Sequence, residues 1–358
     1  CLLITVNCFS QTTFQRFINL EGSSVYYNDN AYFSQQTTDG GYFIVDHSQN
    51  QALGWGLGII KTDSLGIVKW AKRFDHQDIF IGYRDIMGFS AQQTEDGGYV
   101  ITGNYFASIF LLKTDSVGKM QWMKTYGESN LADISFSVRQ TSDLGYIITG
   151  YAHHIGISGT TAPSIYVVKT AADGSLEWSK TYGPGMGYSV REVSSGGYIV
   201  GCSSKLIKLF SNGDIEWSKE MPTVLSVREI NGGGYIASTG LQGGCALAKL
   251  DPSGNLIWLK KYPTVVPFPS FGGHVEQTRD NGVVVNVNSH ALMKADENGN
   301  FLWLRTYKTG TLIRHIGLTT DGGFTMVGQG QNYCQPDSKK YLNSSSSLYF
   351  IKTDSLGR

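Results

Sequence analysis

Residues 139–183 read RQTSDLGYIITGYAHHIGISGTTAPSIYVVKTAADGSLEWSKTYG, and this stretch decides the fold because near-copies of it recur along the whole chain. Within it, four short runs rich in Tyr, Ile, Val and Thr are separated by turns that contain Gly and Asp, which is the pattern of antiparallel strands. We name these runs A to D in chain order. Each copy therefore predicts one four-stranded antiparallel sheet.

A Gly-Gly-aromatic element between runs A and B marks the register of the copies. It occurs seven times, variants included, with first residues at Gly40, Gly97, Leu144, Gly196, Gly233, Asn281 and Gly322. A second turn, between runs C and D, places Asp first and Gly fourth in copies such as residues 115–118, as a type I turn prefers. Seven copies of four strands predict an all-β fold, a seven-bladed β-propeller.

The two ends of the chain fit one closed ring. The last copy has runs A to C and stops at Arg358, whereas residues 14–18 fit run D with no run before them. We therefore expect the N-terminal strand to complete the last blade, which removes an open sheet edge. Residues 11–358 are then a single seven-bladed propeller, and the apolar run at residues 1–10 reads as the remnant of a signal peptide.

Some side chains recur at one position in the repeat, and we interpret them as structural. Six Trp share a place in run D, where we expect them to pack between blades: Trp70, Trp122, Trp178, Trp217, Trp258 and Trp303. Seven lysines share a place in run C, as a packing or snorkelling device: Lys61, Lys113, Lys169, Lys208, Lys249, Lys294 and Lys352. In run A, Arg from one blade is expected to meet Glu of the next; the residues concerned are Arg139, Arg191 and Arg228, which precede Gln140, Glu192 and Glu229.

Composition excludes several classes of partner. Lys plus Arg and Asp plus Glu balance at 29 each, so no overall field attracts nucleic acid or an anionic membrane. The five Cys lack metal-site spacing and predict neither a zinc site nor a disulfide framework. We expect no metal, no cofactor and no membrane insertion, and a glycan or a protein as the partner.

The repeat also carries a family resemblance. The pattern QQTxDGGYxxxG followed by xxKTDSxGxxxWxKTYG, close to residues 91–127, resembles the repeat of secreted and cell-surface β-propeller proteins of Bacteroidetes. Many of these proteins carry a C-terminal sorting domain for type IX secretion. The resemblance covers residues 14–358 and implies export to the surface of a Gram-negative cell, with the secretion machinery as a partner through a sorting domain outside this sequence. It assigns no activity.

Departures from the repeat are where a binding site is expected. Segments of variable length fall in the B-to-C loops and in the crossings from run D to the next run A, which share one face of the propeller. His and aromatic residues gather there and offer stacking area with hydrogen-bonding groups. The predicted ligand-binding residues are His47, Trp55, His76, Tyr83, Tyr105, His153, His154, Phe271, His274 and His315.

Three functions remain open from the sequence. The first is a secreted or surface-attached binding or adhesion propeller that engages a glycan or protein through the variable face. The second is a glycoside hydrolase or lyase with its site at the mouth of the central channel, which predicts carboxylates, or His with Arg, converging in one pocket. The third is a structural spacer in a larger surface protein. No catalytic motif is present in the sequence, so we assign no catalytic residue and favour binding over catalysis.

Overall fold

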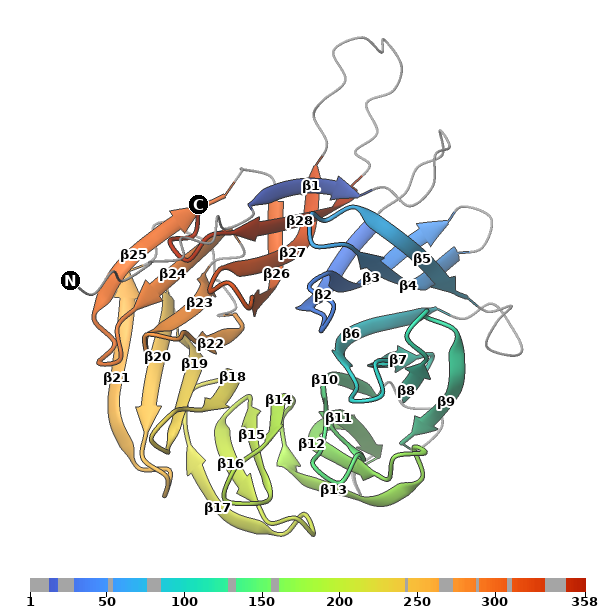
Figure 1. Ribbon diagram of the computed structural model, residues 1–358. Coiled ribbons are helices and arrows are strands. Elements are labelled where there is room, and N and C mark those ends of the chain that lie inside the picture. Colours follow the sequence, from blue (N-terminus) through green and yellow to red (C-terminus); the bar gives the residue numbers. More distant parts are fainter. Residues whose placement is uncertain are drawn as a thin grey trace, which may run out of the picture.

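The computed structural model describes residues 13–18, 29–50, 54–75, 85–127, 133–155, 161–241, 244–263, 273–287, 290–307, 311–331 and 346–358. These residues form seven four-stranded antiparallel sheets arranged around a central axis (Figure 1). Each sheet is one blade, and its first strand lies nearest the axis. The predicted seven-bladed all-β propeller is confirmed.

The strands follow the repeat blade by blade. Blades 1 to 4 are β2 (Asp29–Gln36), β3 (Tyr42–Asn50), β4 (Gly54–Thr62), β5 (Val68–Phe74); β6 (Ile86–Gln93), β7 (Tyr99–Tyr105), β8 (Ser108–Thr114), β9 (Met120–Tyr126); β10 (Ile134–Gln140), β11 (Tyr146–Ile155), β12 (Thr161–Thr170), β13 (Leu176–Pro184); and β14 (Gly187–Glu192), β15 (Tyr198–Cys202), β16 (Lys205–Leu209), β17 (Ile215–Glu220). Blades 5 to 7 are β18 (Val224–Glu229), β19 (Tyr235–Leu241), β20 (Gly244–Leu250), β21 (Leu256–Pro263); β22 (Val275–Gln277), β23 (Val283–Val287), β24 (Ala291–Ala295), β25 (Phe301–Thr306); and β26 (Thr311–Leu318), β27 (Phe324–Gln331), β28 (Ser346–Thr353) with β1 (Phe14–Ile18).

The N-terminal strand closes the ring, as the sequence predicts. Strand β1 pairs antiparallel with β28, with Phe14 opposite Lys352, and so supplies the outermost strand of blade 7. Figure 1 shows the two strands side by side although they come from opposite ends of the chain. The closure leaves blade 7 with the same four strands as its neighbours, so no open edge remains at the junction.

The repeated Trp fills the space between adjacent blades, which confirms its predicted packing role. A Cβ atom on Gly174, in the turn between β12 and β13 of blade 3, would lie 2.7 Å from the ring of Trp122 in blade 2. The same ring lies edge-on to Tyr146, with centroids 6.0 Å apart. Phe14 takes the place of Trp in blade 7, where a Cβ on Gly66 would lie 2.5 Å away. Gly in this turn is therefore required both by its positive φ and by the aromatic ring against it.

The repeated Lys holds the turn of its own blade. The Lys169 side chain is 2% exposed, and its Nζ lies 2.8 Å from Asp143 in the turn between the first two strands. Where Ser195 replaces that Asp in blade 4, Lys208 pairs with Glu216 instead, at 2.9 Å. The predicted structural role is thus correct, and the structure adds that most of these buried ammonium groups are neutralised within their own blade.

Candidate anion-binding site in the central channel

Two positions on each innermost strand can be aligned across the seven blades, because the residue after the strand donates its backbone N–H to a Gly carbonyl in every copy. Two residues before that donor stands the position that we call the charge ring: Gln35, Gln92, Arg139, Arg191, Arg228, Glu276 and Gly317. Four residues before the same donor stands the position that we call the serine ring: Phe33, Ser90, Ser137, Ser189, Ser226, His274 and His315.

In blades 1 and 2, the charge ring is part of the scaffold. The amide oxygen of Gln35 accepts the backbone N–H of Gln93 at 2.9 Å, and that of Gln92 accepts the backbone N–H of Gln140 at 2.9 Å. The serine ring works in the same way, since Ser137 Oγ accepts the backbone N–H of Val190 at 3.2 Å. Each of these bonds ties one blade to the next near the axis.

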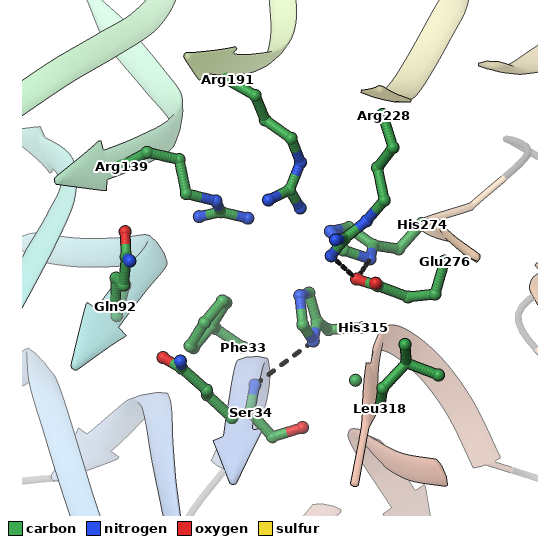
Figure 2. A pocket seen from close by; sticks show the side chains of 13 residues that line it. Phe33, Ser34, Gln92, Arg139, Arg191, Arg228, His274, Glu276, His315 and Leu318 are labelled. Carbon is green, nitrogen blue, oxygen red and sulfur yellow. Dashed lines mark hydrogen bonds and ion pairs between the residues drawn. The ribbon is translucent and has the colours of Figure 1, made fainter. Parts of the chain in front are cut away.

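Blades 3, 4 and 5 depart from this pattern by placing Arg at the charge ring. Figure 2 shows Arg139, Arg191 and Arg228 extending toward a common cavity, with His274 and Glu276 beside Arg228 and His315 on the same cavity. The cavity has a volume of about 310 Å³ and is also lined by Gln35 and Gln92. The serine ring departs in the same place, because blades 6 and 7 carry His274 and His315 there. The non-repeated side chains of both rings thus meet in one pocket.

The three guanidinium groups are balanced unequally. Arg228 forms an ion pair with Glu276, whose side chain is 4% exposed, and donates from Nε to the carbonyl of Val275 at 3.1 Å. Arg139 donates from Nη1 to its neighbour's carbonyl, Val138, at 2.5 Å. Arg191 differs, because its buried Nε and Nη2 have no hydrogen-bond acceptor among the described residues. Burial, followed by the charges of Arg228 and Arg139, lowers the pKa of Arg191.

The two histidines lie against each other on the opposite side. Their ring centroids are 4.2 Å apart. The backbone N–H of Ser34 points at Nδ1 of His315 at 3.5 Å, so the proton of this neutral imidazole belongs on Nε2, which is buried and without an acceptor among the described residues. Burial lowers the pKa of His274 to about 4 and that of His315 well below its usual range, so both rings are neutral at pH 7. The pocket therefore holds two positive charges in excess.

The predicted ligand-binding residues are distributed over several places. His274 and His315 are brought together in the pocket. His47 is buried on β3, where burial and Arg73 lower its pKa to about 4. Tyr105 ends β7, and His153 on β11 donates its backbone N–H to Asp133 at 2.8 Å. Trp55 and His154 lie on β4 and β11 with side chains outside the described part of the chain, and His76, Tyr83 and Phe271 lie outside the described residues altogether. For these eight residues, a role in binding stays a prediction.

The sequence interpretation of the run-A arginines needs correction. Glu192 does not meet Arg139; it accepts the backbone N–H of Ser142 at 2.7 Å and its hydroxyl at 2.8 Å. Glu229 binds Ser194 in the same manner. These carboxylates face the turn of the preceding blade, whereas the Arg side chains, one residue earlier, face the channel. Of these three Arg residues, only Arg228 forms an inter-blade ion pair with a described residue, and its partner is Glu276 of its own ring.

Comparison with known proteins supports the fold and nothing finer. No family model matches the chain, and no curated protein matches it either. Among solved structures, the WD40 β-propeller domain of Doa1 is similar, with 10% identity, coverage of 96% of both chains and a TM-score of 0.61. The Dos1 propeller is 12% identical over 89% of this chain and 77% of its own, with a TM-score of 0.55. A protein of unknown function from Bacteroides caccae is 13% identical over 71% of this chain and 90% of its own, with a TM-score of 0.48.

Two other features of the described residues bear on the class of protein. The described residues contain no helix that is long and apolar enough to cross a membrane. They contain no group of three or more His, Cys, Asp or Glu residues placed to hold a metal ion. The β-propeller is a general scaffold for binding ligands and proteins, so function must be argued from the pocket itself.

Proposed function

We propose that this chain is a binding propeller whose ligand is anionic and enters the central channel at the Arg pocket. The observation that carries the proposal is Arg191, a guanidinium whose buried Nε and Nη2 have no acceptor among the described residues. A buried donor without a partner costs about 1–3 kcal/mol, and more when it is charged. A ligand that supplies acceptors and negative charge removes this cost.

The pocket favours a carboxylate on a hydroxyl-rich body. Its free donors are the guanidinium edge of Arg191 and Nε2–H of His315, and a planar guanidinium matches a carboxylate with two parallel hydrogen bonds. Gln35 and Gln92 add amide groups, and Phe33 adds an aromatic face. Aromatic faces combined with polar groups are suited to sugar rings. The ligand class that fits is therefore an acidic glycan, and an acidic peptide is the alternative that the experiment below distinguishes.

The approach to the pocket differs from the one expected from the loops. A second hollow of about 340 Å³ shares Gln35 and Gln92 with the pocket, and its other lining residues end β2, β6 and β10 or lie in the turns that follow them, such as Thr94 and Ser142. These turns join the first and second strands of blades 1 to 3 and lie on the face opposite the variable loops, which we call the uniform face. The ligand accordingly approaches from the uniform face, while the variable face is left for other contacts with a glycan or protein.

The cellular setting is part of the same proposal. The repeat resembles those of secreted and cell-surface propellers of Bacteroidetes, and an exported protein meets acidic glycans outside the cell. Fractionation of the full-length protein in its own organism, followed by immunodetection, tests this point. Detection in the cytoplasm alone would contradict export and leave the pocket chemistry untouched.

Binding is tested by calorimetry with polygalacturonate, a neutral polysaccharide and poly-glutamate. We expect saturable binding of polygalacturonate, weakened about 10- to 100-fold by Arg191→Gln, because a hydrogen bond to a charged group contributes about 1.5–3 kcal/mol. Lys119→Gln is the control, since it removes the same charge from an exposed turn. Equal binding of the neutral polymer, or equal loss with Lys119→Gln, would contradict the proposal. Binding of poly-glutamate but not of polygalacturonate would show that the ligand class is an acidic peptide.

A further inference from the structure

We propose that this pocket also removes a proton from the carbon next to the carboxylate that it binds, with His274 as the base. The inference rests on the proposed function, because the Arg side chains must first hold the carboxylate. The substrate is then an acid in which the carbon next to the carboxylate loses a proton and the following carbon carries an oxygen substituent, as in a uronate residue within a glycan. The activity is then an elimination that cleaves the glycan substrate.

His274 lies beside a carboxylate that can orient it as a general base. Its Nδ1 lies 3.3 Å from Oε1 of Glu276, and Figure 2 shows the carboxylate between His274 and Arg228. Burial raises the pKa of Glu276, but the charge of Arg228 and the neighbouring His274 outweigh it and lower that pKa to about 2, so the group is a carboxylate at neutral pH. Nδ1 has no hydrogen-bond partner among the described residues in this geometry, but the negative charge beside it favours the tautomer with the proton on Nδ1, which leaves the lone pair of Nε2 available to accept another.

Other side chains that line the pocket supply what the resulting carbanion needs. Removal of a proton beside a carboxylate moves a second negative charge onto the carboxylate oxygens. Arg191 and Arg139 carry the two positive charges that Glu276 does not offset, and Nε2–H of His315 is a further donor without an acceptor in the described part of the chain. Donors fixed in place before the reaction stabilise such developing charge most effectively, because they need not reorganise.

The reaction balances without an oxidant or a reductant. Nε2 of His274 takes the proton from the carbon beside the carboxylate, and the C–H electron pair forms a double bond to the next carbon. The bond from that carbon to its oxygen substituent breaks, and the oxygen leaves with the electron pair of that bond. The imidazolium of His274 then gives its proton to the leaving oxygen. The products are an unsaturated acid and an alcohol, and His274 returns to its neutral form.

Glu276 is a positioning residue in this scheme, since it acts through His274. The scheme also predicts a pH dependence that an ordinary His would not give. Because burial holds the pKa of His274 near 4, the base stays unprotonated well below its usual range. The elimination rate should remain level through neutral pH and fall only as the pH approaches about 4.

The test uses the full chain with polygalacturonate in deuterium oxide. Ultraviolet absorbance reports the new conjugated double bond, mass spectrometry reports deuterium in recovered substrate, and calorimetry reports binding separately. We expect His274→Gln to lose at least about 100-fold in elimination rate, the lower range for removing a general base, while it still binds polygalacturonate. Lys119→Gln should match the unaltered protein in all three measurements.

The outcomes separate this inference from the proposed function. Binding without a double bond and without deuterium uptake would overturn the activity and leave the binding proposal standing. Absence of binding would remove both. Elimination that survives in His274→Gln would show that another group is the base, and a rate that falls near pH 6.5 would contradict the buried His274 as well.

Discussion

Blades 1 and 2 and blades 3 to 5 carry different side chains at one place beside the channel. Gln35 and Gln92 each accept a backbone N–H of the next blade at 2.9 Å, so they stabilise the ring. Arg139, Arg191 and Arg228 have no oxygen to offer, and the structure places their charges around a cavity instead. The comparison teaches that this propeller replaces an amide acceptor by a positive charge at one position in three successive blades, which is expected where function competes with stability.

The largest effect is expected from removing the charge that partly balances the Arg blades. Glu276→Gln leaves Arg228 without its carboxylate beside two other guanidinium groups, and breaking a buried ion pair costs about 3 kcal/mol or more. Urea denaturation measures the change in the free energy of unfolding. Glu192→Gln is the matched control, because blade 3 already has Gln at that position, as Gln140, and its amide oxygen keeps the same bond. If the two variants lose equal stability, the ion pair between Arg228 and Glu276 is not buried as described.

A smaller loss is expected from making blade 2 resemble blade 3. Gln92→Arg removes the acceptor of the Gln140 N–H and places another guanidinium next to Arg139. An orphaned buried donor alone costs about 1–3 kcal/mol, so we expect a loss of about 2 kcal/mol in the same urea measurement. Gln92→Met, which removes the hydrogen bond without adding charge, separates the two causes. A variant as stable as the parent would contradict the scaffold role of this position.

The fold was predictable from the sequence for the same reason that the site was not. Trp122, Gly174 and Lys169 recur because every blade needs the same turn and the same packing, so repetition identifies them. The site consists of residues that do not recur, and their charges suggested a different role. Because Glu192 and Glu229 follow Arg191 and Arg228 directly, an Arg of one blade was expected to pair with a Glu of the next blade. Which strand face meets the axis is set by how the blades pack around it, and run A alternates equally well in either orientation.

A signal for the pocket was nevertheless present in the aligned copies. Aligning them on the residue after run A puts Gln, Gln, Arg, Arg, Arg, Glu and Gly in one column and two His at the end of another. His274 and His315 were selected because they lie near variable segments, yet the structure joins them through their repeat position. The variable loops drew attention to the other face, because loop length is visible in a sequence and depth in a channel is not.

The pH dependence of stability distinguishes the His side of the pocket from the Ser that blades 2 to 5 carry at the same position. The pKa of His274 lies near 4 in the folded protein and near 6.5 when unfolded, so the unfolded chain binds more protons between these values. Stability is therefore complete above pH 6.5 and is lost as the pH falls toward 4. Replacing both residues, as His274→Ser with His315→Ser, should reduce this slope in denaturation curves taken across that range. His47, with its own pKa near 4, and Glu276, whose pKa is lowered to about 2, contribute to the slope that remains. An unchanged slope would place the titrating groups elsewhere.

The smallest effect is a gain, and it tests the comparison most directly. Arg191→Gln restores at blade 4 the side chain of blades 1 and 2, and its amide oxygen can accept the backbone N–H of Glu229 as Gln92 accepts that of Gln140. A typical net hydrogen bond contributes about 1 kcal/mol, so we expect the free energy of unfolding to rise by about that amount. Arg139→Gln, facing Glu192, should behave alike. A stability gain combined with lost polygalacturonate binding would show that Arg191 is kept at a cost to the fold. A loss of stability would mean instead that the guanidinium supports the channel, and the division between scaffold blades and binding blades would have to be withdrawn.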